Sequence, residues 1–151
     1  MHKSMRSCTH WKRQLHGPKA SQPLLMRLKS DLVPYLLHTI DGTLDQLEAP
    51  DWDPRPAVCV MATSGGYPAE YRKGVPIHGL DAVATGPDLQ VFHSGTSRTL
   101  GGDTVTAGGR VLSVCALGDT IGSARDAAYR ALEQVEFQGM HFRRDIAMGR
   151  A

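Results

Sequence analysis

Two short apolar runs, each adjoining a glycine-containing turn, constrain the fold of this chain more than any other feature. Residues 57–62 lead into Ser64-Gly-Gly-Tyr-Pro68, and residues 110–117 follow Thr106-Ala-Gly-Gly. Both runs are short and rich in residues that favour strands. They predict two buried strands, the first ending in a tight turn and the second following one.

Three weaker patterns add to the predicted sheet. Residues 89–93 alternate between apolar and polar side chains, which is typical of a half-buried strand. Residues 98–104 contain Gly101-Gly-Asp103, which indicates a hairpin turn. Residues 140–146 are interpreted as a last strand.

One helix is predicted after Thr120, and Gly139 is expected to stop it. Its apolar face is narrow and consists mostly of small residues, which would let it lie close to a sheet. The face comprises Ala124, Ala127, Ala128, Ala131, Leu132 and Val135.

The N-terminal part of the chain predicts two helices before the first strand. Pro23 suits the first turn of one helix, and Ser30 is expected to cap the next, with Asp31 in its first turn. Gly42 is expected to end this second helix. The polar segment 51–56 then has the composition of a linker.

Together these elements predict an α+β fold: a small, mostly antiparallel, barrel-like sheet with one packed helix, preceded by a helical arm. We expect a basic, disordered leader at 1–21, a helical segment at 22–50 and the main domain at 57–151.

Charge and composition exclude several classes of protein. Residues 1–20 hold five of the 17 Lys and Arg residues and none of the 15 acids, so the rest of the chain is mildly acidic. This disfavours a nucleic-acid surface, and no apolar stretch is long enough to predict a membrane span. Cys8, Cys59 and Cys115 make no disulfide framework, and the latter two are expected to be buried. A reducing, cytoplasmic location fits this usage.

The two glycine motifs are also candidate binding sites. Gly65 and Gly66 would let the backbone approach an anion, or they could form a plain strand-end turn, which is the commoner use of such glycines. Gly109 precedes Arg110, whose guanidinium could hold a phosphate or carboxylate or could form a structural salt bridge.

A second candidate site lies between the two predicted N-terminal helices. Arg27 and Lys29 beside a helix N-terminus could bind a phosphate, or they could form a solvated basic turn. Arg143-Arg-Asp145 is interpreted as a structural charge cluster. His38, His78, His93 and His141 are interpreted as surface or core residues. Cys8, His10 and His16 make a weak zinc pattern.

Many segments from Gln22 onward resemble, in order, phosphoribosylamine–glycine ligase, also called glycinamide ribonucleotide synthetase. Gln22–Leu32 resembles the segment that closes the ATP-grasp core of that family. The segments that resemble its C-terminal domain are Ala57-Val-Cys-Val, Ser64–Pro68, Gly74–Ile77, Gly79–Asp81, Val91–His93, Gly95-Thr96, Thr106–Leu112, Ala116–Thr120 and Phe142–Ile146.

This resemblance implies a reaction of purine (IMP) synthesis. The complete family enzyme uses ATP and Mg or Mn to activate glycine as an acyl phosphate, which the amine of 5-phosphoribosylamine then attacks. The resemblance favours substrate contacts, rather than proton-transfer roles, for the candidates Arg27, Lys29, Gly65, Gly66, Gly109 and Arg110. We predict no catalytic residue, metal ligand or cofactor site in this chain.

The family's metal-binding motif, of the type E-x-N-x-R-F-G-D-P-E, does not precede Gln22. We therefore expect a fragment that is inactive alone, with two alternatives: a module that still binds a ribose phosphate, or a piece that complements a separate ATP-grasp chain. An apolar surface along Leu25, Leu28, Leu36 and Leu37 is expected to cause association.

Overall fold

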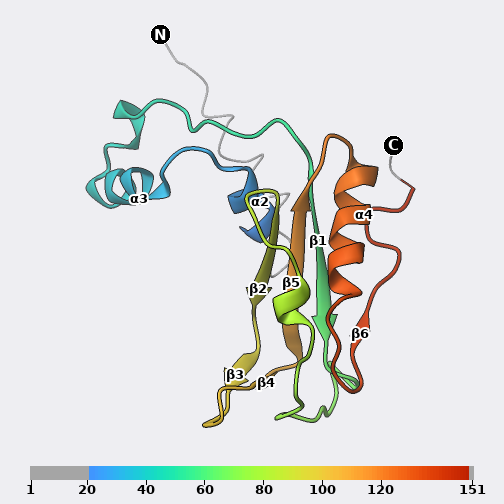
Figure 1. Cartoon of the computed structure of the whole chain (residues 1–151). Coiled ribbons are helices and arrows are strands. Elements are labelled where there is room, and N and C mark those ends of the chain that lie inside the picture. Colours follow the sequence, from blue (N-terminus) through green and yellow to red (C-terminus); the bar gives the residue numbers. More distant parts are fainter. Residues whose placement is uncertain (1–20, 150–151) are drawn as a thin grey trace.

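The computed structural model describes residues 21–149. The expectations for the leader at 1–20 and for the Cys8, His10 and His16 pattern lie outside these residues. Ser21, the last residue assigned to the leader, is instead the first residue of a helix. Figure 1 shows a sheet with one long helix against it and a helical arm to one side. The elements in chain order are α2 (Ser21–Arg27), α3 (Leu32–Asp41), the 3-10 helix η1 (Leu44–Gln46), β1 (Ala57–Thr63), η2 (Leu80–Ala82), β2 (Leu89–His93), β3 (Thr96–Arg98), β4 (Thr104–Thr106), β5 (Arg110–Leu117), α4 (Ile121–Leu132) and β6 (His141–Phe142). No helix within 21–149 has the length and apolar character needed to cross a membrane.

The two apolar runs form the centre of the sheet, as their composition predicted. Strand order is β2-β5-β1-β6, and every neighbouring pair is antiparallel. Val60 of β1 lies opposite Val114 of β5, and both are fully buried. The predicted hairpin forms a separate two-stranded sheet of β3 and β4. The α+β class with a mostly antiparallel sheet is thus confirmed.

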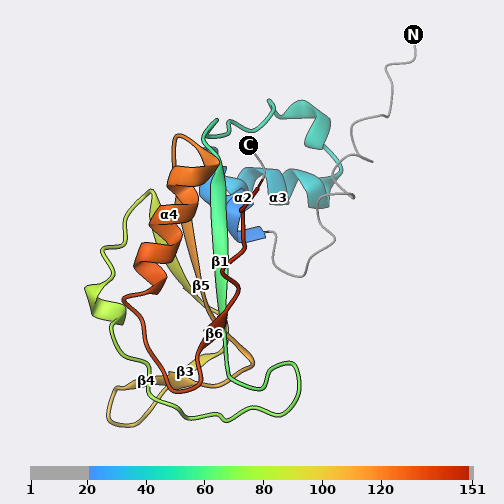
Figure 2. The same cartoon turned by 90° about the vertical axis from the view of Figure 1, so that its right-hand side faces the viewer.

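Helix α4 covers one face of this sheet, and its axis runs along the strands (Figure 2). Thr120 is its N-cap and forms a reciprocal capping box with Ser123. Ala124 and Ala128 are fully buried, since small side chains let the helix backbone approach the sheet. The helix ends at Leu132, well before the expected stop at Gly139. The backbones of His78 and Glu136 exchange two hydrogen bonds, of 2.8 and 3.0 Å, and this pairing diverts the chain from the helix.

The last predicted strand is shorter than expected, because only His141 and Phe142 pair with β1. The chain then turns, and the Arg143 side chain pairs with Asp145 at 2.6 Å. The Tyr129 hydroxyl of α4 donates to the Arg143 carbonyl oxygen at 2.7 Å, which holds this turn against the helix. Arg143 and Asp145 thus pair with each other, but in the turn that follows β6 and not on a strand.

The arm contains α2 and α3, and one predicted cap in it is wrong. Asp31, not Ser30, is the N-cap of α3, and its carboxylate accepts from the Val33 amide at 2.9 Å. Ser30 Oγ instead accepts from the Asp51 amide at 2.7 Å, because residues 51–53 lie alongside the end of α2. Gly42 ends α3 as predicted.

The expected apolar surface is present on the arm, with one exception. Leu25, Leu36 and Leu37 are 49, 54 and 55% exposed. Leu28 is half-buried because it lies in a β-bridge with Trp52.

Candidate functional site

The two glycine motifs come together where β1 ends and β5 begins. Ser64 is nearly buried and is the residue that joins them: its amide donates to the Gly109 carbonyl oxygen at 2.8 Å, and its hydroxyl donates to the Gly108 carbonyl oxygen at 3.0 Å. A seryl side chain serves here because it can reach a backbone acceptor next to its own strand. The turn after β1 is therefore fixed directly to the segment that leads into β5.

Tyr67 packs against this junction at Gly109. A Cβ atom at position 109 would lie 2.0 Å from Tyr67 Cδ2, so only glycine leaves room for the ring. Tyr71 makes an edge-to-face contact with Tyr67, with ring centroids 5.9 Å apart. The turn and the aromatic pair thus form one packed unit around Gly109.

The loop that follows Tyr67 returns to the same place. Thr106, at the end of β4, is nearly buried; its Oγ1 accepts from the Val75 amide at 3.1 Å, and its carbonyl oxygen accepts from the Gly74 amide at 2.6 Å. A cavity of about 270 Å³ lies here. It is lined by Ser64, Gly65, Arg72, Val75, Thr106, Gln138 and Gly139.

Arg110 begins β5, immediately after the junction. It is half-buried and takes part in no ion pair or side-chain hydrogen bond with any residue in 21–149. The structural alternative for Arg110, a salt bridge, is therefore not found in the described chain. A half-buried guanidinium of this kind retains its capacity to bind an anion.

Sequence reasoning missed a polar groove next to this junction. The groove has a volume of about 760 Å³ and lies between η2, β2 and the β3–β4 hairpin. Its lining includes Arg98 and two histidines, His78 and His93, which the sequence pattern did not single out as site residues. His93 Nδ1 lies 2.9 Å from Thr96 Oγ1, which orients the ring. The signals for it in the sequence were the Gly74–Ile77, Gly79–Asp81 and Val91–His93 segments of the family resemblance, which all contribute to its lining.

Arg27 and Lys29 lie at the opposite end of β1. Arg27 Nε donates to the Asp53 carbonyl oxygen at 3.0 Å, and the Lys29 amide donates to the Asp51 carbonyl oxygen at 3.0 Å. Arg27 is thus adjacent to a residue that precedes β1, whereas Gly65 follows it. A seven-residue strand spans roughly 20 Å, so the six candidates form two groups that cannot share one small ligand.

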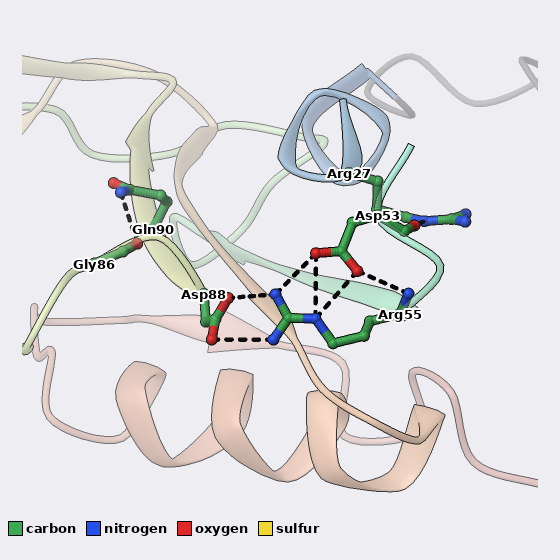
Figure 3. Close-up of polar contacts among 6 residues, drawn as sticks. All are labelled: Arg27, Asp53, Arg55, Gly86, Asp88 and Gln90. Atoms are coloured by element: carbon green, nitrogen blue, oxygen red, sulfur yellow. Dashed lines mark hydrogen bonds and ion pairs between the residues drawn. The ribbon is translucent and has the colours of Figure 1, made fainter. Parts of the chain in front are cut away.

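The segment 51–56, expected to be a linker, is held by charge (Figure 3). Asp53 is 8% exposed, and Arg55 donates to its carboxylate through Nε and, at 2.8 Å, through Nη2. The same guanidinium donates to both carboxylate oxygens of Asp88, at 2.7 and 3.1 Å. These bonds from Arg55 lower the pKa of Asp53 from 3.8 to about 2 and also lower the pKa of Asp88. Because Arg55 is committed to two carboxylates, this cluster stabilises the fold and is a poor anion site.

The residues 21–149 contain no group of three or more His, Cys, Asp or Glu side chains that could hold a metal ion. No step of the function proposed below passes through a metal on this part of the chain.

Comparison with known proteins gives a consistent result. Residues 57–149 match the family model described as phosphoribosylglycinamide synthetase, C domain. The chain is 45% identical over 131 residues to a phosphoribosylamine–glycine ligase of Rhodopirellula baltica, which covers 87% of this chain and 30% of the relative. It is 48% identical over 130 residues to the ligase of Allochromatium vinosum, covering 86% and 30%.

A crystal structure of phosphoribosylamine–glycine ligase from Thermotoga maritima has a similar fold. The TM-score is 0.60 at 32% identity, and the match covers 76% of this chain and 27% of that one. The chain therefore spans about 30% of the length of the relatives that it matches.

Proposed function

The chain belongs to the phosphoribosylamine–glycine ligase family, whose C domain it contains, and we propose that it supplies one wall of the substrate site in an ATP-dependent ligase that joins glycine to 5-phosphoribosylamine. The reaction belongs to purine synthesis, and we expect it to take place in the cytoplasm. The ATP and metal sites of that reaction would lie outside residues 21–149.

The half-buried Arg110 carries this proposal. It adjoins the packed junction of Ser64 and Gly109 and has no carboxylate partner in the described chain. A phosphate group on the substrate would give the guanidinium a bidentate partner, which is the geometry that arginine favours. We therefore assign Arg110 a role in binding the ribose phosphate.

The part of the substrate site that this chain supplies would position the substrate and neutralise its charge. In acyl transfer to an amine, holding the reactants in contact removes much of the entropic barrier. Backbone amides and a guanidinium can neutralise phosphate charge without moving a proton. Gly65, Gly66, Gly109 and Arg110 fit such a role, and none of them is proposed as a general acid or base. Arg27 and Lys29, at the other end of β1, could contact only a different part of the complete enzyme.

Titration calorimetry with glycinamide ribonucleotide tests the proposed contact. The wild-type chain should bind it, and Arg110→Ala should weaken binding by about tenfold or more, because a charge-assisted hydrogen bond is lost. Arg125→Ala is the matched control: Arg125 is also half-buried, but it pairs with Asp126 on α4 at 2.8 Å. Absence of heat with the wild type, or equal weakening in both variants, would refute the assignment.

The same proposal predicts no turnover by this chain alone. Incubation with ATP, a magnesium salt, glycine and phosphoribosylamine should release no ADP above the rate without protein. Clear release of ADP that depends on phosphoribosylamine would show that the chain is a complete catalyst and would overturn the proposal.

A second candidate function is an interaction module that complements a separate ATP-grasp chain. The arm favours it, because α2, α3 and Trp52 surround an apolar cavity of about 530 Å³ next to exposed leucines. Mixing the chain with the part of the Rhodopirellula baltica ligase that it does not match should give a complex that releases ADP. Leu36→Ser should weaken this complex, whereas Leu100→Ser, an equally apolar but fully exposed position on the β3–β4 turn, should not. Unchanged assembly by Leu36→Ser would contradict the module.

A further inference from the structure

Two cysteines lie directly opposite each other in the centre of the sheet. Cys59 is in β1 and Cys115 in β5, and the register pairs them. Because opposite residues in an antiparallel pair point to the same face, both side chains lie on the sheet face turned away from α4.

The backbone hydrogen bonds show which kind of pair this is. The Gly118 amide donates to the Pro56 carbonyl oxygen at 3.2 Å, so positions 56 and 118 form a hydrogen-bonded pair. Bonded and non-bonded pairs alternate along an antiparallel ladder. Counting inward from 56 and 118, the pair Cys59 and Cys115 is non-hydrogen-bonded. A second hydrogen bond agrees with this assignment: the Leu117 amide donates to the Asp88 carbonyl oxygen at 2.8 Å. The backbone amides of Leu117 and of every second β5 residue, Cys115 included, therefore point towards β2 and away from β1.

A non-hydrogen-bonded pair has the spacing that a disulfide needs. Its Cα atoms are about 4.5 Å apart, and disulfides span Cα distances of about 4.4–6.8 Å. Neither cysteine is in a disulfide in this structure. The two thiols are nevertheless in contact: a hydrogen bond with Cys59, together with burial, raises the pKa of the Cys115 thiol.

The two thiols differ in access. Cys115 is fully buried, whereas Cys59 is half-buried beside α2. Gln22 of α2 lies over the pair, and its Oε1 accepts from Cys59 Sγ at 3.5 Å and from Ser113 Oγ at 2.9 Å. A reagent would therefore reach Cys59 first, at the edge of α2.

We propose that Cys59 and Cys115 are an oxidative modification site, at which a peroxide converts the two thiols into a disulfide between β1 and β5. The Cys59 thiolate attacks one peroxide oxygen, the O–O bond breaks, and Cys59 becomes a sulfenic acid with release of water or an alcohol. Cys115 then attacks the Cys59 sulfur, the S–O bond breaks, and a second molecule leaves as water. Together the two thiols lose two electrons, and these electrons reduce one peroxide molecule. Both thiol protons end in the released molecules.

Oxidation also changes the attachment of α2. The disulfide has no S–H group, so Gln22 loses the hydrogen bond from Cys59 and keeps only that from Ser113. We infer that α2 is held less firmly in the oxidised chain. The site would thereby couple the redox state of the sheet to the arm.

The test uses the full chain with Cys8→Ser, because Cys8 is a third thiol outside the described residues. After treatment with hydrogen peroxide, the protein is denatured in a maleimide reagent and its intact mass is measured. We expect both thiols to escape labelling and the mass to fall by about 2 Da, the two hydrogens lost on disulfide formation. A digest should contain one cross-linked peptide joining β1 and β5.

Single variants separate this site from general thiol oxidation. In Cys115→Ala, Cys59 should stop at the sulfenic acid, which dimedone traps. In Cys59→Ala, Cys115 should remain a thiol under the same exposure. Gln22→Ala should speed disulfide formation several-fold. In hydrogen exchange, amides of α2 should exchange faster in the oxidised chain than in the reduced one, and amides of α4 should not.

Three outcomes would overturn the proposal. The first is that both cysteines stay thiols at a peroxide dose that oxidises Cys59 in Cys115→Ala. The second is that Cys59 gains oxygen atoms in the parent chain without any cross-link. The third is that the only disulfide formed joins two copies of the chain.

Discussion

Replacement of Gly66 by alanine tests the packing of the glycine junction most directly. Gly66 has φ +91°, and a Cβ atom placed there would lie 2.2 Å from the Glu70 carbonyl oxygen. That oxygen belongs to the backbone, so it cannot rotate away as a side chain could. The loop from Ser64 to Val75 would have to move as a whole.

The cost has two parts, and a second glycine separates them. An L-residue in a left-handed conformation costs about 1–2 kcal/mol, and the overlap should add about 1–3 kcal/mol, as other overpacked sites do. The lower entropy of the unfolded alanine chain returns about 0.4–1 kcal/mol. Gly102 has φ +90° but open space around its Cβ position, so Gly102→Ala should bear the conformational cost alone.

Urea unfolding followed by far-ultraviolet circular dichroism measures both variants. We expect a loss of unfolding free energy of about 3 kcal/mol for Gly66→Ala and about 1 kcal/mol for Gly102→Ala. Gly66→Ala should also bind glycinamide ribonucleotide more weakly, since the Ser64 turn is displaced from Gly109. A difference between the two variants below about 0.5 kcal/mol would refute the reasoning, because that is the range of ordinary surface substitutions.

Three further predictions concern charge, core and surface. Asp53 has its pKa lowered to about 2, so it binds fewer protons when folded than when unfolded, and its contribution to stability is present above its ordinary pKa of 3.8 and lost as the pH falls through 2. The urea midpoint of Asp53→Asn should therefore lie below that of the wild type by the largest amount near neutral pH, and the difference should shrink as the pH falls through this window. A difference between the two midpoints that does not change with pH would contradict this reasoning. Leu132→Ala should cost about 2–5 kcal/mol in urea unfolding, because Leu132 is fully buried under the sheet, whereas Ile121→Ala, at a 41% exposed position of the same helix, should cost well under half of that. The wild-type chain should associate and bind a hydrophobic dye, and the double variant Leu36→Ser with Ile40→Ser, at positions 54 and 80% exposed, should do so less; a monodisperse wild-type monomer in size-exclusion chromatography that binds no dye would show that this surface is harmless.

Local patterns predicted the parts of the fold whose physics is local. The apolar runs at 57–62 and 110–117 became the central strands, because a short apolar run between turns is buried most readily as a strand in the middle of a sheet. The alanines after Thr120 predicted the face that α4 buries, since the period of a helix decides which side chains share a face. Where elements ended was predicted less well, as the early end of α4 at Leu132 shows.

The candidate site was predicted only in part, because only some of its residues belong to local sequence motifs. Glycine motifs are visible in a sequence, and Ser64, Gly109 and Arg110 did prove to be neighbours. The polar groove lined by His93 and Arg98 was not predicted, because its residues come from separate elements and none of them forms a motif.

The sequence by itself determined which segments are strands, which face of α4 is buried, and which family the chain resembles, because composition and periodicity are properties of neighbouring residues. Only the tertiary structure decided which distant residues meet. It separated Arg27 from Gly65 by the length of β1, paired Arg55 with Asp88, and placed Cys59 opposite Cys115. Strand register is a relation between segments far apart in the chain, and side-chain packing across the whole core selects it.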